Sequence, residues 1–180
     1  MAKTYATHVD LPSHVREQLV RTLNLGLANA LDLYLQAKHA HWNAKGKHFL
    51  SRHELFDEVA EHLRKRSDEV AERLSTLGGY VEGTARLVAR SSELAEHDLD
   101  ATTADEHLTS LVHKFAKHSA LLRKAIDQVR DLNDPATEDV LMKALREAEK
   151  DLWLLESHTH ARPTAHVEEE IPTPSPGVPH

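Results

Sequence analysis

Residues 53–72, HELFDEVAEHLRKRSDEVAE, have the pattern of one amphipathic helix whose polar side carries metal-ligand side chains. Apolar residues recur every three or four positions, as expected for a helix with one buried face. On the polar side His53 and Asp57 are four residues apart, and so are Asp68 and Glu72. At about 100° per residue, the step from Asp57 to Asp68 returns to nearly the same side of the helix. Both pairs therefore lie on one stripe.

The two pairs are too far apart to bind one metal ion. At about 1.5 Å per residue, Asp57 and Asp68 lie roughly 16 Å apart along the helix axis, whereas metal ligands lie about 2.0–2.6 Å from the ion. An antiparallel two-fold partner that crosses near His62 and Leu63 would place the second pair of one chain opposite the first pair of the other. The stripe therefore predicts metal sites shared between two subunits.

Each half of the stripe also has a structural explanation. Residues 67–74, SDEVAERL, would on their own be an ordinary solvated helix face. His53 on its own is compatible with a packed or surface histidine.

Composition favours a helical protein of one domain. The 180 residues suffice for a full core, and residues with high helix propensity abound while aromatic residues are only 4%. There is no cysteine, so disulfides and thiolate sites are excluded. No apolar run is long enough to cross a membrane, and the N-terminus MAKTYATHVDLP lacks the apolar core of a signal peptide. We therefore expect a soluble, cytoplasmic protein.

Charge and histidine content bear on partners. The net charge of −7 argues against electrostatic binding of nucleic acid by the protein as a whole. The 15 histidines are unusual, and histidine is the commonest metal-binding side chain.

The chain divides into an arm over residues 1–12, a helical domain over 13–160 and a Pro- and Glu-rich tail over 161–180 that we expect to be disordered. The connector over residues 80–99 is too long for a turn between antiparallel neighbours, so it predicts a crossover between parallel helices. The expected fold class is all-α, a four-helix bundle whose crossover carries a short helix near 87–96. The long helices are expected at about 13–43, 49–77, 103–132 and 135–158.

The chain resembles the Dps family, the ferritin-like mini-ferritins of starved bacteria, over about residues 10–160. No histidine has a glutamate three residues before it, so the Glu-x-x-His signature of di-iron sites within one chain is absent. The resemblance rests on His41-Trp42-Asn43, Gly46, Phe49, His53-Glu54, Phe56-Asp57, Asp68-Glu69, Ala71-Glu72-Arg73, Leu77-Gly78-Gly79 and Leu152-Trp153.

The resemblance implies a hollow homo-dodecamer that oxidises Fe(II), preferably with hydrogen peroxide, stores the ferric mineral and protects against oxidative stress. Its ferroxidase ligands fall on His41, His53 and Asp57 of one subunit and on Asp68 and Glu72 of the two-fold mate. Imidazole and carboxylate groups suit iron, and zinc is expected as a substitute metal.

Further residues near these ligands have two explanations each. Trp42 is either a packing residue or a redox neighbour that absorbs stray oxidising equivalents. His39 and His48 are surface residues or extra metal contacts. Glu54, Glu58 and Glu61 are either solvated or face the mineral cavity.

Three acidic residues stand at the junction of the last two long helices. They are either helix-capping acids or, by the resemblance, the lining of three-fold pores that draw Fe(II) inward. These residues are Asp134, Glu138 and Asp139.

Two other functions remain open from the sequence, a DNA-compacting nucleoid protein and a general zinc- or copper-buffering cage. The N-terminal arm has only Lys3 before Arg16, and the tail beyond Arg162 carries Glu168, Glu169 and Glu170 without any Lys or Arg. We therefore expect DNA binding to be weak or absent at neutral pH, although nucleoid association is compatible with the resemblance.

Overall fold

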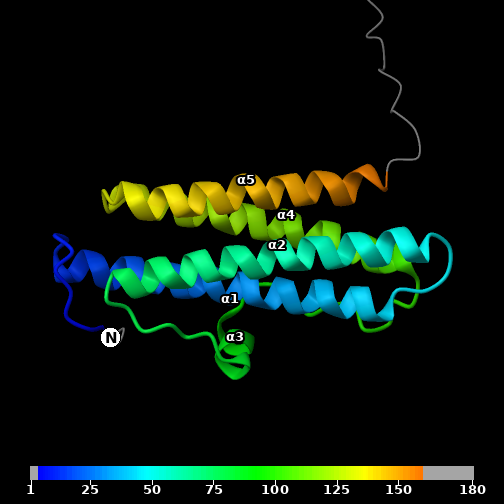
Figure 1. The fold of residues 1–180 in the computed structure, drawn as a ribbon, viewed down its shortest axis with the longest axis horizontal. Coiled ribbons are helices and arrows are strands. Elements are labelled where there is room, and N and C mark those ends of the chain that lie inside the picture. Colours follow the sequence, from blue (N-terminus) through cyan, green and yellow to red (C-terminus); the bar gives the residue numbers. More distant parts are fainter. Residues whose placement is uncertain (1–3, 160–180) are drawn as a thin grey trace, which may run out of the picture.

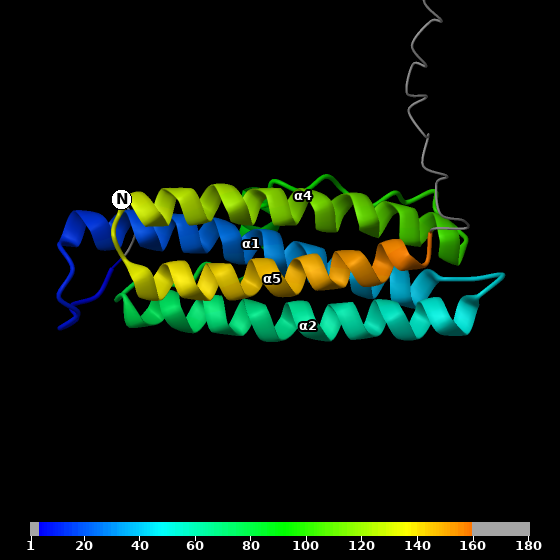
Figure 2. The same ribbon diagram turned by 90° about the horizontal axis from the view of Figure 1, so that it is seen from above.

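The computed structural model describes residues 4–159, and its four long helices form a bundle. Figures 1 and 2 show α1, α2, α4 and α5 running along the same axis, with the short α3 outside the bundle against α1. The predicted all-α, four-helix fold is confirmed, while the predicted tail over residues 161–180 lies outside the described residues. The helices are α1 (Ser13–Asn43), α2 (Phe49–Thr76), α3 (Ala85–Ser91), α4 (Ala104–Asp131) and α5 (Pro135–Ser157).

The end of α2 depends on two glycines. Gly78 has φ +77°, and a Cβ atom there would lie 2.6 Å from the backbone oxygen of Tyr5. At Gly79, a Cβ atom would lie 2.6 Å from the Val20 side chain. The backbone NH of Tyr5 donates to the Gly78 carbonyl oxygen at 2.6 Å. The helix therefore stops where the N-terminal segment packs against it.

The connector between α2 and α4 is held along α1 by amide side chains. Asn24 accepts from the backbone NH of Glu82 at 2.9 Å, and Asn29 accepts from the backbone NH of Glu93 at 2.7 Å. Gln36 donates to the Ala95 carbonyl oxygen at 3.1 Å. Because these contacts hold the connector to α1 at three points along its length, it is an ordered part of the domain.

The crossover predicted from the connector length is confirmed. The backbone NH of Ala104, the first residue of α4, donates to the carbonyl oxygen of Lys45 in the loop before α2 at 2.9 Å. Helices α2 and α4 therefore start at the same end of the bundle and run parallel (Figure 1). Thr103 and Glu106 form a capping box that fixes the first turn of α4.

The short helix begins and ends earlier in the chain than the sequence predicts. It was expected near 87–96, but α3 spans Ala85–Ser91. The chain leaves the helix because Ser92 and Glu93 turn toward α1: the Ser92 hydroxyl donates to Asp32 at 2.5 Å, and the Glu93 backbone binds Asn29. These tertiary contacts outweigh the helix propensity of the following residues.

Apolar residues fill the bundle along its whole length in two clusters. One cluster is centred on Leu19, Leu23, Leu74 and Leu141, and the other on Leu33, Phe56, Leu63 and Phe115. No helix in residues 4–159 is both long enough and apolar enough to span a membrane.

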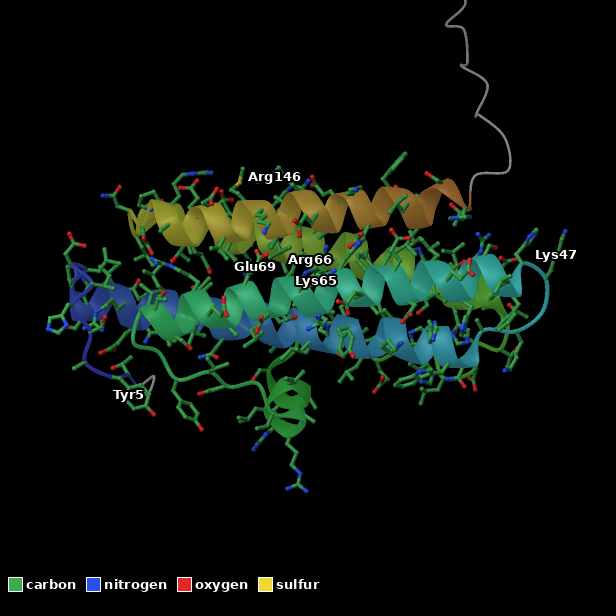
Figure 3. All side chains as sticks on the ribbon, viewed as in Figure 1. Tyr5, Lys47, Lys65, Arg66, Glu69 and Arg146 are labelled. Atoms are coloured by element: carbon green, nitrogen blue, oxygen red, sulfur yellow. The ribbon has the colours of Figure 1, made fainter. Side chains whose placement is uncertain are left out.

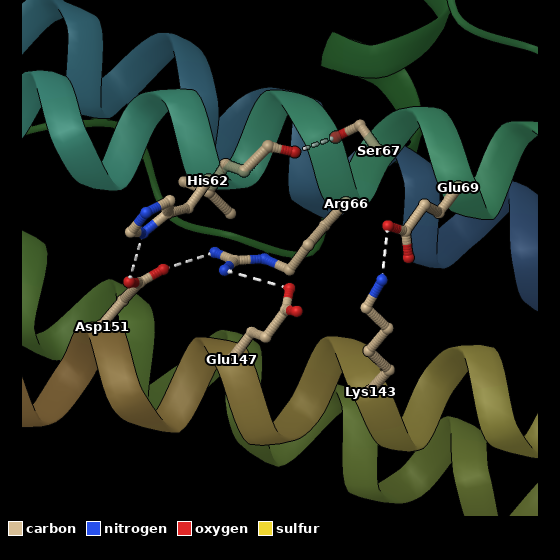
Figure 4. A network of polar contacts seen from close by, with 8 residues as sticks. His62, Arg66, Ser67, Glu69, Lys143, Glu147 and Asp151 are labelled. Carbon is tan, nitrogen blue, oxygen red and sulfur yellow. Dashed lines mark hydrogen bonds and ion pairs between the residues drawn. The ribbon is translucent and has the colours of Figure 1, made fainter.

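A buried polar network joins α2 to α5 at mid-bundle (Figure 4). The Asp151 side chain is 1% exposed and accepts from Arg66 Nη2 at 2.6 Å, while its other oxygen lies 2.8 Å from His62 Nδ1. Lys143 donates to Glu69 at 2.6 Å one turn away. Figure 3 shows Lys65, Arg66 and Glu69 near the middle of α2, whereas Lys47 lies at the loop at one end of the bundle.

Candidate metal centre

His41 and His53 face each other across α1 and α2. Their rings are stacked, with centroids 3.7 Å apart and planes inclined by 19°. His41 Nδ1 lies 2.8 Å from the backbone oxygen of His53, and His53 Nδ1 lies 2.8 Å from the backbone oxygen of His41. The two residues are thus locked to one another by a crossed pair of hydrogen bonds.

This crossing decides which ring nitrogens are available to a metal. A carbonyl oxygen only accepts hydrogen bonds, so each Nδ1 must carry the hydrogen. In the neutral ring the lone pair then lies on Nε2, which is the atom that can bind a metal. A backbone carbonyl that holds the other nitrogen of a histidine ligand is a common support in metal sites.

Asp57 stands one turn after His53 and forms an ion pair with α1. Lys38 Nζ lies 2.6 Å from Asp57 Oδ1 and also lies 5.6 Å from the centre of the Trp42 ring. The hydrogen bond and charge of Lys38 hold the pKa of Asp57 below its ordinary value. A metal ion that uses Asp57 must therefore displace or share this ammonium group.

The structure does not bring the whole predicted ligand set together within one chain. His41, His53 and Asp57 line one shallow depression, whereas Asp68 and Glu72 are exposed further along α2. Within residues 4–159, no three histidine or acidic side chains converge on a point that would hold a metal ion. Glu54, Glu58 and Glu61 line the same depression and make it strongly acidic.

His62 and Leu63, near which the two-fold partner is predicted to cross, make their contacts within the subunit. His62 lies at the axial midpoint of the stripe, but its ring is directed to Asp151 on α5. Leu63 is fully buried in the core. The residues on the stripe at this level are Glu61 and Arg64, which form an exposed ion pair at 2.7 Å. At about 100° per residue, His62 falls well away from the stripe.

Apolar side chains next to the depression are exposed. Trp42 is 62% exposed, Leu50 is 63% exposed and Phe49 is 39% exposed. The Phe49 ring centroid lies 5.1 Å from that of His53. Trp42 is therefore not a core residue of the single chain, and this rim offers apolar surface to a second subunit.

The three acidic residues predicted as pore lining have different environments. Asp134 is only 6% exposed and pairs with Arg73 at 2.7 Å. Burial opposes its ionisation, but hydrogen bonds from Thr137 and Arg73 outweigh that effect and lower its pKa. Glu138 pairs with Arg130 at 2.9 Å, whereas Asp139 is exposed. Asp134 therefore joins α2 to α5 within the subunit.

Sequence reasoning missed a second group of histidines. His97 of the connector and His107 of α4 lie beside His39, which had been noted only for its proximity to His41. Neither residue stands at a ligand-like spacing from the others, so only the packing of the connector reveals the group.

Known proteins resemble this chain over most of its length. The family model for the ferritin-like domain matches residues 20–162. The DNA protection during starvation protein of Agrobacterium fabrum is 36% identical over 160 residues, which are 89% of this chain and 99% of that protein. DpsC from Streptomyces coelicolor has a TM-score of 0.84 and 27% identity, covering 91% of this chain and 96% of its own.

A further similar structure belongs to a protein whose description names a metal centre. The DPS protein from Vibrio cholerae O1, described as a member of a broad superfamily of ferritin-like diiron-carboxylate proteins, has a TM-score of 0.79 and 26% identity, with 88% of this chain and 100% of that chain covered. The architecture, the helix lengths and these likenesses together show that the chain belongs to the Dps family of ferritin-like proteins.

Proposed function

We propose that this protein is a ferroxidase and iron store in which two subunits share each oxidation site. Membership of a ferritin-like diiron-carboxylate family supports iron storage and oxidative protection in general. The observation that carries the specific proposal is the crossed His41–His53 pair beside Asp57, which presents two imidazole nitrogens and a carboxylate at one depression.

The partner subunit supplies the remaining ligands in this proposal. Asp68 and Glu72 are exposed on the same stripe of α2 as His53 and Asp57. Asp57 and Asp68 lie roughly 16 Å apart along the helix axis, so the two pairs of one chain cannot bind the same ion. An antiparallel partner that crosses at the level of Glu61 and Arg64 brings both carboxylates to the depression, and two equivalent sites arise for each pair of subunits.

The ligand set suits the oxidation of Fe(II) as a substrate. Neutral imidazoles bind the ferrous ion, and the added carboxylates favour the harder ferric product. With hydrogen peroxide as oxidant, two Fe(II) ions lose one electron each. Peroxide takes up both electrons and two protons, its O–O bond breaks, and two water molecules form. Both reagents of hydroxyl-radical chemistry are consumed in this step.

The exposed apolar rim supports assembly. Trp42, Phe49 and Leu50 are exposed near the half-site on the single chain. Burying such side chains against a second subunit is favourable by about 25 cal/mol per Å² of apolar surface. We propose that this contact is part of a hollow dodecamer, with the acidic residues at the start of α5 near the pores. Asp139, rather than the buried Asp134, is the carboxylate best placed to attract Fe(II) there.

The test is the rate of Fe(II) oxidation in a charge-matched pair of variants. Anaerobic Fe(II) is mixed with the apo protein, peroxide is added, and ferric absorbance is followed. The variant Asp68→Asn, Glu72→Gln should oxidise Fe(II) at least about tenfold more slowly while remaining assembled.

The control variant Asp100→Asn, Glu149→Gln removes the same charge from the connector and from α5, and its rate should match the wild type. If wild type and both variants share one slow rate, the shared ferroxidase site does not exist.

A further inference from the structure

Three histidines from three different elements meet on the side of α1 that faces the connector and α4. The ring centroids of His39 and His97 are 5.0 Å apart, those of His97 and His107 are 5.2 Å apart, and those of His39 and His107 are 6.0 Å apart. His39 belongs to α1, His97 to the connector and His107 to the first turn of α4. Only the crossover topology brings them together.

Two of these rings are buried and only partly hydrogen-bonded. His97 is 3% exposed and His107 is fully buried. His97 Nε2 lies 2.9 Å from His107 Nδ1, so one nitrogen donates to the other, while His97 Nδ1 has no hydrogen-bond partner among the described residues. Buried polar atoms without partners are costly and uncommon. The pair therefore has hydrogen-bonding capacity that its own contact does not use.

Burial disfavours the protonated form of both buried rings. Burial, followed by the neighbouring His107 and His39, lowers the pKa of His97 to about 4. Burial also lowers the pKa of His107.

The ring separations match those of three histidines around one tetrahedral ion. A zinc–nitrogen bond of about 2.0–2.1 Å places each ring centroid about 3.2 Å from the metal, so neighbouring centroids are about 5.2 Å apart at the tetrahedral angle. The observed separations of 5.0, 5.2 and 6.0 Å bracket this value.

Three adjustments would complete the set. The 2.9 Å contact between His97 Nε2 and His107 Nδ1 must widen to about 3.3 Å for two nitrogens bound to one tetrahedral ion. The hydrogen between these two nitrogens must move to the far nitrogen of the ring that carries it, so that both present lone pairs to the metal. His39 must rotate to direct a nitrogen inward, since no three ligand atoms converge within residues 4–159 as they stand. Its ring is partly exposed and has a contact of 3.5 Å with the Asn43 amide, so this rotation loses little.

We propose that His39, His97 and His107 form a zinc site that clamps the connector to α1 and α4. Three imidazoles without a carboxylate favour zinc or its borderline neighbours over iron. The negative charge of Asp98 acts on both buried rings and offsets part of the metal charge, although Lys114 opposes it at His97. The partly exposed side at His39 leaves the fourth position to water.

This site is separate from the proposed ferroxidase centre. His39 and His41 are two residues apart, so they point about 200° apart around α1. His41 stacks on His53 of α2, whereas His39 faces the connector and α4. The zinc proposal therefore does not rest on the ferroxidase proposal.

The experiment measures zinc binding in a background without the ferroxidase half-site. The assembled protein carrying His53→Asn and Asp57→Asn is stripped with a chelator and dialysed against Zn²⁺ alone. Bound metal is then counted by elemental analysis, and the melting temperature is recorded. We expect about one tightly bound zinc per chain and a higher melting temperature with zinc than without it.

Adding His39→Gln or His97→Gln to this background should weaken zinc binding at least about tenfold and remove the thermal stabilisation. The control His113→Gln changes an exposed histidine on α4 and should leave both unchanged. If His97→Gln fails to fold, the partly exposed His39→Gln decides alone. Absence of tight zinc binding in the background, or unchanged binding in His39→Gln, would overturn the proposal.

Zinc-soaked crystals of the wild type give a second measurement. Anomalous diffraction should place a zinc ion between the three rings. Zinc found only at the His41–His53 depression would also overturn the proposal.

Discussion

The backbone carbonyl of His41 holds the His53 ring, and the backbone carbonyl of His53 holds the His41 ring. In each case the ring Nδ1 lies 2.8 Å from the carbonyl oxygen of the other residue. The two histidines are thus oriented before any metal or partner subunit arrives. Such preorganisation keeps ligand atoms in place without an entropic loss at the moment of binding. The hydrogen bond and the metal ligand use different nitrogens, so the two roles are separable by substitution.

His53→Asn should abolish metal binding at the half-site while keeping the fold. The asparagine amide stands near the position of Nδ1, so it still donates to the His41 carbonyl oxygen, but the ligand nitrogen Nε2 is gone. We expect Fe(II) oxidation to fall at least about tenfold with a nearly unchanged melting temperature. His53→Ala removes both groups and should lower the melting temperature as well. Oxidation at the wild-type rate in His53→Asn would exclude His53 as a ligand.

Lys38→Met should strengthen the first binding of Fe(II). Lys38 Nζ lies 2.6 Å from Asp57 Oδ1, so the ammonium group competes with the metal for this carboxylate. An exposed ion pair is worth about 0–1 kcal/mol, which predicts a dissociation constant up to roughly fivefold smaller. Anaerobic titration calorimetry measures it. Lys47→Met, in the loop before α2, serves as the charge-matched control and should leave the dissociation constant unchanged. Weaker Fe(II) binding in Lys38→Met would contradict the prediction and show that Lys38 assists the site.

The sequence was sufficient for the long helices because their signals are local. Apolar periodicity, the Gly78-Gly79 stop and Pro135 at the first turn of α5 located the helices to within a residue or two. The short helix was displaced because Asn29 and Asp32 of α1, far away in the sequence, bind the residues after it.

The candidate site also combines features that follow from local spacing with features that depend on contacts between residues far apart in the sequence. The stripe with His53 and Asp57 follows from helical spacing alone, because residues four apart share a side of a helix. The Lys38–Asp57 ion pair and the meeting of His97 with His107 depend on how separate elements pack, so no spacing rule revealed them.

Asp151→Ala should destabilise the bundle strongly. The substitution leaves the buried guanidinium of Arg66 with only the longer contact to Glu147 at 3.8 Å and removes the acceptor beside His62. Breaking a buried ion pair from one side costs about 3–5 kcal/mol. Urea unfolding at fixed protein concentration measures the loss. The double variant Arg66→Met, Asp151→Leu should recover much of it, and a neutral effect of Asp151→Ala would show that solvent reaches the pair.

Acid should destabilise the fold through His118. Burial, followed by the charge of Arg66, lowers its pKa from 6.5 to about 3. Below pH 6.5 the unfolded chain therefore binds a proton that the folded chain does not, and stability falls as the pH falls toward about 3. This group contributes a slope of up to about 1.4 kcal/mol per pH unit. Urea unfolding between about pH 7 and pH 5 should show a shallower slope in His118→Leu than in wild type or in the exposed-site control His113→Leu.

DNA should not be retarded by this protein at neutral or alkaline pH. The net charge is −7 with histidines neutral, and phosphate binding depends on clustered Lys and Arg. Because histidine ordinarily gains its charge between about pH 5 and pH 8, weak, salt-sensitive binding is expected near pH 6. The buried His97 and His118 contribute nothing there, since their pKa values are lowered to about 4 and about 3. A gel shift at about pH 8 and about pH 6 tests this expectation. Retardation at about pH 8 by the apo protein would instead favour DNA compaction as a function of the assembled protein.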